Sequence, residues 1–299
     1  MFAAILTTIL WAISVVCGHR AAKMIGGSEA NFWRLSVATL FLGIWAYGFG
    51  QKLEGDSFPL FLWSGVIGIG VGDVALFQAL PRMGSRVTIL IIQCLSAPFA
   101  AFIEWLWLGT RLTGSQMFCG IVILGGVSLA LTPLKHLNLT RRQITVGTSF
   151  AILAALGNAF GAVLTRKGYV AATAIRENID GGTAAFQRLV GGLLVAGIWL
   201  LMVKQGTQSP ARFASPGEKW RKVWPWVLAN GFAGQTLGNT FYLLALKHTP
   251  TGIVMPIIAT TPLVVIPFAR WMEAEKPTMR SMVGAVIAVL GVIGLVVAK

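Results

Sequence analysis

Long apolar stretches separated by short polar connections occupy almost the whole chain of 299 residues. A helix that crosses the hydrocarbon core of a bilayer needs about 20 apolar residues. These stretches are continuous and do not alternate between apolar and polar positions, so they favour spanning helices over the strands of a barrel. We predict an all-α membrane protein with ten transmembrane helices, at residues 2–18, 31–49, 59–80, 86–108, 115–132, 147–165, 184–203, 223–246, 252–272 and 280–298.

The two halves of the chain repeat one another. The sequence Phe32–Leu35 has a counterpart in Phe186–Leu189, and each carries an arginine at its third position. The stretch from Gly65 to Leu80 matches residues 231–246 at a constant offset of 166 residues, with glycines at three equivalent positions. We therefore expect two five-helix repeats, at residues 1–134 and 147–299, joined by a loop at residues 135–146.

The number of spans in each repeat has a topological consequence. Five is odd, so the second repeat enters the membrane from the opposite side and the repeats are inverted. An inverted duplication of this kind is typical of secondary transporters, which bind their substrate where the repeats meet. Small residues four apart, as in Gly68 and Gly72 or Gly234 and Gly238, would let helix backbones approach closely there.

Composition agrees with a membrane location. Hydrophobic residues make up 56% of the chain and charged residues 11%, against about 25% charged in soluble domains. The net charge of +14 comes from lysines and arginines in short loops, without a basic domain or stripe. We therefore expect a lipid bilayer and a small-molecule substrate as partners, no nucleic acid, and a monomer or weak dimer.

Metal, cofactor and disulfide chemistry find no support in the sequence. Cys17, Cys94 and Cys119 each lie inside an apolar run, and the three histidines map to loops or span ends without metal-ligand spacing. We expect no metal site and no cofactor. Residues 2–18 lack a preceding basic region and a cleavage site, which favours a first span over a signal peptide.

The ends of the repeats carry a family resemblance. Glu275-Lys276-Pro277-Thr278 is followed by Gly284 and Gly291, and the Ala79-Leu80 pair recurs as Ala245-Leu246. These features resemble the drug/metabolite transporter superfamily, in its ten-helix EamA-type branch. The first half departs from the family pattern at Thr110, where the family commonly carries Glu.

The resemblance covers essentially the whole chain. It implies ten helices around a central cavity, alternating access, and transport of a small metabolite, for which we expect export across a bacterial-type inner membrane. It also implies cytoplasmic termini. The lysines and arginines, concentrated in the loops after the odd-numbered spans, place the termini on the other side by the positive-inside rule, so the orientation stays open.

Ionisable residues inside the membrane are costly and point to function. Asp73 is the deepest acid, and Arg34 lies near the start of the preceding span, on the same side of the membrane. Their depths differ by about 6 Å at 1.5 Å per helical residue, so we predict that they pair, directly or through substrate.

The second repeat keeps the cation and loses the anion, because Arg188 matches Arg34 whereas Asn239 matches Asp73. Spare positive charge suits a substrate with a carboxylate or phosphate, such as an amino acid. The alternative is that both arginines extend to the interface and anchor their helices.

Neutral polar residues complete the candidate substrate site. Gln235, Asn239 and Tyr242 share one face of a regular helix, which could bind ligand or join helices. The other candidates are Trp11, Ser14, Gln78, Gln93 and Asn158. Glu104 lies near a span end; we favour an interfacial position over a titrating acid.

Other functions fit less well. Gly70-Val71-Gly72-Asp73 resembles a motif of intramembrane aspartyl proteases, but the remaining aspartates, Asp56 and Asp180, lie in loops, so no carboxylate dyad forms. A serine protease would need a deep histidine, which is lacking. We expect no enzymatic activity. A channel or facilitator remains the main alternative, although no selectivity-filter motif is visible, and an assembly subunit is a third.

Overall fold

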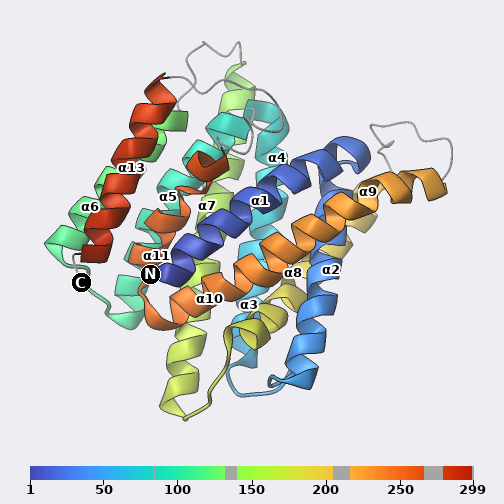
Figure 1. The fold of residues 1–299 in the computed structure, drawn as a ribbon, viewed down its shortest axis with the longest axis horizontal. Coiled ribbons are helices and arrows are strands. Elements are labelled where there is room, and N and C mark those ends of the chain that lie inside the picture. Colours follow the sequence, from blue (N-terminus) through green and yellow to red (C-terminus); the bar gives the residue numbers. More distant parts are fainter. Residues whose placement is uncertain (84, 132–139, 205–215, 266–278, 298–299) are drawn as a thin grey trace.

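The computed structural model describes residues 1–83, 85–131, 140–204, 216–265 and 279–297. None of the described residues lies in a β-strand, and helices account for nearly all of them (Figure 1). Helical residues make up most of the described part of each predicted span. The helices are α1 (Phe2–Ile25), α2 (Gly27–Gly48), α3 (Phe58–Gly65), η1 (Val66–Val71), α4 (Gly72–Met83), α5 (Ser85–Leu108), α6 (Gly114–Leu131), α7 (Arg141–Ala174), α8 (Gly181–Lys204), α9 (Pro216–Asn230), η2 (Gly231–Gly238), α10 (Asn239–His248), α11 (Thr251–Ile258) and α13 (Met279–Val297).

Two helices extend well beyond their predicted bounds for local reasons. Helix α1 continues to Ile25 and ends at Gly26, whose φ of +86° suits glycine and breaks the helix before α2. Helix α7 begins at Arg141, inside the predicted loop 135–146. Its start is fixed by a capping box, in which the Thr140 hydroxyl accepts from Gln143 N at 3.3 Å and the Gln143 side chain accepts from Thr140 N at 2.9 Å.

Seven helices or continuous helical runs of the described chain are long and apolar enough to cross a membrane. The outer faces of these helices and of α2 carry large apolar side chains, among them Leu40, Ile44, Phe118 and Leu201, each more than half exposed. Water-soluble monomers rarely expose so much contiguous apolar surface. The described chain therefore has the surface of a multi-pass membrane protein. Residues 266–272 of the predicted ninth span and the Glu275–Thr278 motif lie outside the described residues.

Two of the predicted spans contain a π-helical segment. The segment η1 follows α3, and η2 follows α9. The sequence offset of 166 residues places Val66–Val71 on residues 232–237, inside η2. π-helical turns are rare and often occur at functional sites. Their occurrence at equivalent positions of both halves therefore matches the sequence repeat.

The two π-helical segments pack reciprocally. Segment η1 contacts α7 and α8 of the second half, whereas η2 contacts α1 and α2 of the first. A Cβ at Gly68 would lie 3.2 Å from the Cα of Gly161, and one at Gly234 would lie 2.0 Å from the Ser14 hydroxyl. Each glycine-rich segment thus lies across the first two helices of the other half, as small-residue helix packing allows.

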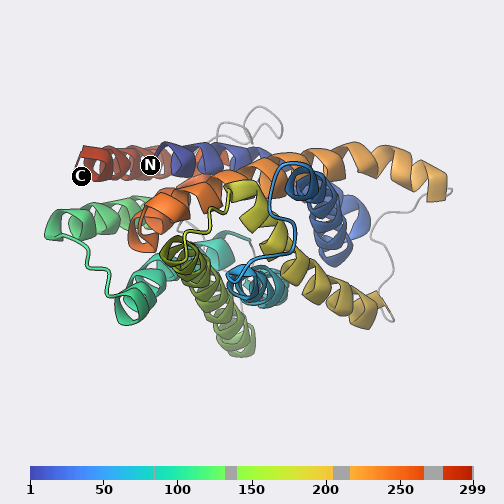
Figure 2. The ribbon, with the colours of Figure 1, turned by 90° about the horizontal axis from the view of Figure 1, so that it is seen from below.

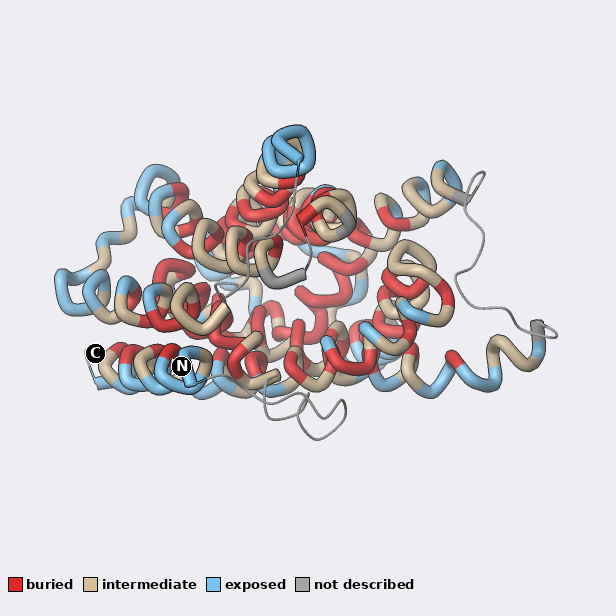
Figure 3. Tube along the Cα trace, turned by 90° about the horizontal axis from the view of Figure 1, so that it is seen from above, coloured by how far each residue is buried: buried red, intermediate tan, exposed pale blue. Residues whose placement is uncertain are grey.

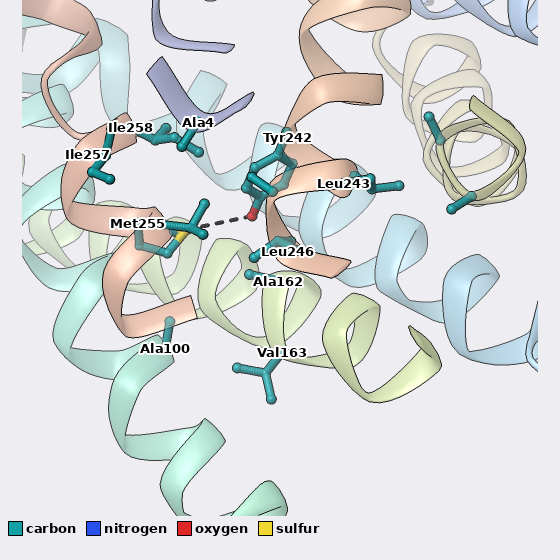
Figure 4. Close-up of a cluster of buried hydrophobic side chains, with 14 of the residues drawn as sticks. Ala4, Ala100, Ala162, Val163, Tyr242, Leu243, Leu246, Met255, Ile257 and Ile258 are labelled. Atoms are coloured by element: carbon teal, nitrogen blue, oxygen red, sulfur yellow. Dashed lines mark hydrogen bonds between the residues drawn. The ribbon is translucent and has the colours of Figure 1, made fainter. Parts of the chain in front are cut away.

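One buried core lies where α1, α5, α7, α10 and α11 meet. Figure 4 shows Leu246 and Met255 close to Ala162 and Val163, with the Tyr242 hydroxyl 3.5 Å from the Met255 sulfur. Buried residues gather in the middle of the molecule and exposed ones toward its outer helices (Figure 3). The start of α1 and the end of α13 lie near one another in Figure 1 and again from below in Figure 2.

Candidate functional site

Arg34 and Asp73 form a direct ion pair. The Arg34 Nη2 atom on α2 lies 2.9 Å from Asp73 Oδ2 in the first turn of α4. The Arg34 Nε group also donates to Asn31 Oδ1 at 2.7 Å, which holds the guanidinium plane in position. The predicted pairing is confirmed, and this arginine already has its counter-ion.

Arg188 on α8 has no such partner. The residue is 5% exposed, and neither Nε nor Nη1 has a hydrogen-bond partner among the described residues. Its guanidinium carbon lies 5.4 Å from the centre of the Tyr242 ring. A cation–π contact contributes about 0.5–2 kcal/mol, whereas burying an ion costs several kcal/mol. The ring therefore does not replace an anion, and the interpretation of Arg188 as a surface anchor does not fit its burial.

The side-chain amide of Asn239 is a second buried donor without a hydrogen-bond partner among the described residues, and it lies on the same helix as Tyr242. The residue begins α10, is 2% exposed, and its Nδ2 has no partner within the described chain. It precedes Tyr242 by three residues on the same helix, so the two side chains share a face. In the first repeat the equivalent position carries Asp73, which neutralises Arg34. The second repeat has instead an unpaired cation and an unpaired amide donor.

Trp11 and Ser14 connect α1 to this region. The Trp11 ring packs on Tyr242 with centroids 5.3 Å apart, and its Nε1 donates to the Gly234 carbonyl at 3.1 Å. The Ser14 hydroxyl donates to Asn230 Oδ1 at 2.6 Å. Ser14 therefore joins α1 to α9, whereas Trp11 also forms part of the surroundings of Tyr242.

The remaining candidates are distributed more widely. The side-chain Oδ1 atom of Asn158 would lie 3.3 Å from a Cβ at Gly72. This α7 side chain therefore lies beside the residue that precedes Asp73. Gln78 accepts from Arg82 one turn later in its own helix at 3.0 Å. Gln93 is half-buried on α5. The contacts thus join Arg188, Tyr242 and Trp11, with Asn239 on the same helix as Tyr242. Arg34 pairs with Asp73, which also interacts electrostatically with Arg188.

The predicted common face of Gln235, Asn239 and Tyr242 crosses a change of helix type and stays a prediction. Gln235 lies inside η2, whose hydrogen bonds run from residue i to i+5, and Asn239 lies just beyond it. A π-helical turn holds slightly more than four residues, so a spacing of four still returns close to the same face. Asn239 and Tyr242 are buried, whereas Gln235 is half-buried.

Glu104 was expected at the interface, and this prediction is wrong. The side chain is 2% exposed and accepts from Arg166 Nε at 2.5 Å and from the Thr251 backbone N–H at 2.6 Å. The Thr251 hydroxyl also donates to it, and Arg166 Nη1 donates to the Leu246 carbonyl at 2.8 Å. Sequence reasoning missed this network because the Arg166-Lys167 pair marked a span end, whereas α7 continues to Ala174.

Asp180 fixes the start of α8 from outside the spans. Its Oδ1 accepts from Trp45 Nε1 at 2.9 Å and from Gly182 N at 2.8 Å. Burial opposes the charged form, but these bonds and those from Thr183 outweigh it and hold the pKa of the Asp180 carboxyl below its usual value. The sequence had placed this residue in a loop without a role.

Two hollows in the described part of the chain lie elsewhere. A cavity of about 590 Å³ lies between α5, α6 and α11, and another of about 540 Å³ lies beside Trp33 and Trp220. None of the predicted substrate residues lines either of them. The first is almost wholly apolar and does not contain the unpaired polar groups. We therefore base the candidate site on the side-chain chemistry around Arg188.

Comparison with known proteins identifies the relatives of this chain. The sequence profile of the EamA-like transporter family matches residues 1–132 and 145–297. No curated protein matches the sequence. One solved crystal structure superposes with a TM-score of 0.79 at 12% identity, over 99% of this chain and 96% of the other. At that identity the likeness shows a shared fold alone.

Proposed function

Because the chain belongs to the EamA-like transporter family, we propose that it is a secondary transporter that exports a small solute across the inner membrane of a bacterial-type cell by alternating access. The solute carries a carboxylate or a phosphate, as an amino acid or an organic phosphate does. Its anionic group binds Arg188. The unpaired, buried guanidinium of that residue is the observation that carries the proposal.

Reciprocal packing supports a transport path between the halves. Segment η1 lies on α7 and α8, and η2 lies on α1 and α2. These contacts fit two inverted five-helix units, at residues 1–134 and 147–299, that make ten spans in all. Rocking of one unit against the other would open the contact region to each side in turn.

The charge asymmetry supports an anionic substrate. Asp73 neutralises Arg34, whereas Arg188 contacts the Tyr242 ring and forms no salt bridge with any described residue. A carboxylate or phosphate accepts charge-assisted hydrogen bonds from a guanidinium, and these are about twice as strong as neutral ones. An ammonium or guanidinium substrate would instead be repelled by the unpaired cation.

Asp73 is the candidate for coupling to protons. It interacts electrostatically with both Arg34 and Arg188. Protonation would release Arg34, so the ion pair could change between transport states. In this proposal Arg188 binds the substrate, and the Arg34–Asp73 pair senses the driving ion.

A binding screen followed by transport tests the proposal. Purified protein is heated with amino acids, organic phosphates and cationic drugs, and we expect anionic compounds to raise the melting temperature. Proteoliposomes then measure saturable uptake of each hit. Arg188→Gln should abolish both responses, while Arg142→Gln, at an exposed site in the first turn of α7, should leave both intact. Stabilisation by cations alone, or flux that does not saturate, would contradict the proposal.

A further inference from the structure

An apolar groove of about 590 Å³ runs between α5, α6 and α11, outside the group around Arg188. These three helices lie side by side in Figure 1 and contact one another. The groove has small residues among those that line it: Ala97 and Ala101 from α5, Gly120 from α6 and Gly252 from α11. A side chain at Gly120 would meet Pro256 only at ordinary contact distance, 3.8 Å.

The walls of the groove face outward. Phe102 is 57% exposed and Ile121 is 67% exposed, and Trp105 and Met117 are also exposed. Large apolar side chains in this position are favourable against hydrocarbon and unfavourable against water. The groove is therefore open to the surrounding lipid.

The length of the groove matches one leaflet. Its polar end lies at the connection between α5 and α6, and its far end is marked by Ala97 and Leu124. Each of these lies about ten residues along its helix from that connection, which corresponds to about 15 Å at 1.5 Å per residue. Half of the hydrocarbon core of a bilayer is also about 15 Å thick. A single acyl chain would fill the groove from end to end.

The polar end carries one cation. Thr110, Arg111 and Gln116 line the groove there. The Gln116 side-chain oxygen accepts from the Thr113 backbone N–H at 3.0 Å, and the Thr113 hydroxyl accepts from the Gln116 backbone N–H at 3.3 Å. The Gln116 side-chain oxygen is therefore already used in capping α6. Arg111 is exposed and makes no ion pair with any described residue. It is the charged group that a headgroup at this end would meet.

We propose that this groove binds one acyl chain of an anionic phospholipid, with the headgroup phosphate on Arg111. The apolar walls favour an acyl chain, and a groove as long as one leaflet favours a lipid over a compact solute. The arginine at the polar end of the groove favours a negatively charged headgroup. The groove also borders Gly252, the residue after Thr251, which Glu104 holds in place. A bound lipid would brace α11 against α5 and α6.

Native mass spectrometry of the detergent-purified full chain tests this site. The protein is titrated with phosphatidylglycerol, with phosphatidylcholine of the same chains, and with glycerol phosphate as a headgroup without a chain. We expect one phosphatidylglycerol to bind several-fold more tightly than phosphatidylcholine, and glycerol phosphate not to compete.

Two variants and one control separate the contributions. Arg111→Gln should weaken phosphatidylglycerol binding about fivefold and leave phosphatidylcholine unchanged, since one arginine near an anionic surface contributes about that factor. Gly120→Leu should fill the groove and weaken both lipids. Arg142→Gln, at an exposed arginine outside the groove, should change neither. Each variant is first checked for an unchanged circular dichroism spectrum and elution volume.

Three results would overturn the proposal. They are equal binding of the two lipids, loss of phosphatidylglycerol binding in the Arg142 control to the same extent as in the Arg111 variant, and full competition by glycerol phosphate. The last would indicate a site for a free anion. The test needs no transported substrate, so its result is independent of the proposed function.

Discussion

Gly65 packs directly against the backbone of Arg188: a Cβ on the glycine would lie 1.7 Å from the arginine's carbonyl oxygen. Gly231, the equivalent residue of the second half, has the same relation to Arg34, at 2.9 Å. The carbonyl that each glycine contacts belongs to an arginine of the other half. The positions of the paired cation and the unpaired cation are therefore both set by the contact between the repeats.

Gly65→Ala should destabilise the protein more than Gly231→Ala, because its new methyl group meets a backbone atom at a much shorter distance. Overpacking of this kind costs about 1–3 kcal/mol or more. Gly125→Ala is the matched control, since nothing lies within 4 Å of its Cβ position. Melting temperatures in detergent should fall in the order control, Gly231 variant, Gly65 variant. Equal melting temperatures for the three would contradict the close approach.

Arg188→Met should make the ligand-free protein more stable while removing its response to anions. The substitution replaces a buried, unpaired cation with an apolar side chain of similar length, a gain on the order of 1–4 kcal/mol. Thermal unfolding with and without an anionic ligand measures both effects. A less stable variant would show that the guanidinium has a partner that compensates its charge.

Asp73→Asn should impair transport and flatten its pH dependence. The change removes the carboxylate that lies 2.9 Å from Arg34 and leaves that cation without its counter-ion. Initial uptake rates across a pH series in proteoliposomes measure this. Arg142→Gln, at an exposed residue in the first turn of α7, is the control. Unchanged rates and pH profile for the Asp73 variant would exclude this residue from the coupling step.

Glu104→Gln should destabilise the fold by about 3–5 kcal/mol, because it leaves Arg166 partly buried without its anion. Adding Arg166→Met should restore much of the loss, since the pair is then replaced by uncharged groups. Denaturant titration in detergent micelles measures the original protein, both single variants and the double variant. A double variant as unstable as the sum of the single variants would argue against direct coupling.

Asp180→Asn should reduce stability at neutral pH and little at low pH. The folded-state pKa of this carboxyl lies below its unfolded value, about 3.9. Its contribution is therefore fully present above pH 4 and is lost as the pH falls through the folded-state pKa. Melting curves from pH 7 to pH 3 should converge for the two proteins. Asp56→Asn, at an exposed residue of the connection before α3, serves as the control.

Much of the fold could be predicted from the sequence. Continuous apolar runs gave the helices, because backbone in hydrocarbon must bond to itself. The sequence repeat also located the glycines that pack against Arg34 and Arg188. Helix ends were less predictable. Helix α7 starts at a capping box, outside the apolar run, and continues past Arg166 to Ala174. A prediction of span ends from apolar runs alone therefore misses both ends of this helix.

The candidate site was predictable in part. The spacing of Arg34 and Asp73 along their helices placed them at similar depth, and they pair. The π-helical segment η2 was not visible in the sequence, because its residues fit a regular apolar helix equally well. The burial of Glu104 depends on Arg166 and Thr251, which come from distant segments and meet only in the folded chain.

The surplus guanidinium of Arg188 would also make the transport cycle sensitive to membrane voltage. An empty carrier presents one uncompensated positive charge to the electric field, and a bound monoanion cancels it. Moving one elementary charge through 100 mV changes the free energy by about 2.3 kcal/mol. The resting potential would therefore change the free energy of the step in which the empty carrier returns, and it would hardly change that of the step in which the loaded carrier crosses.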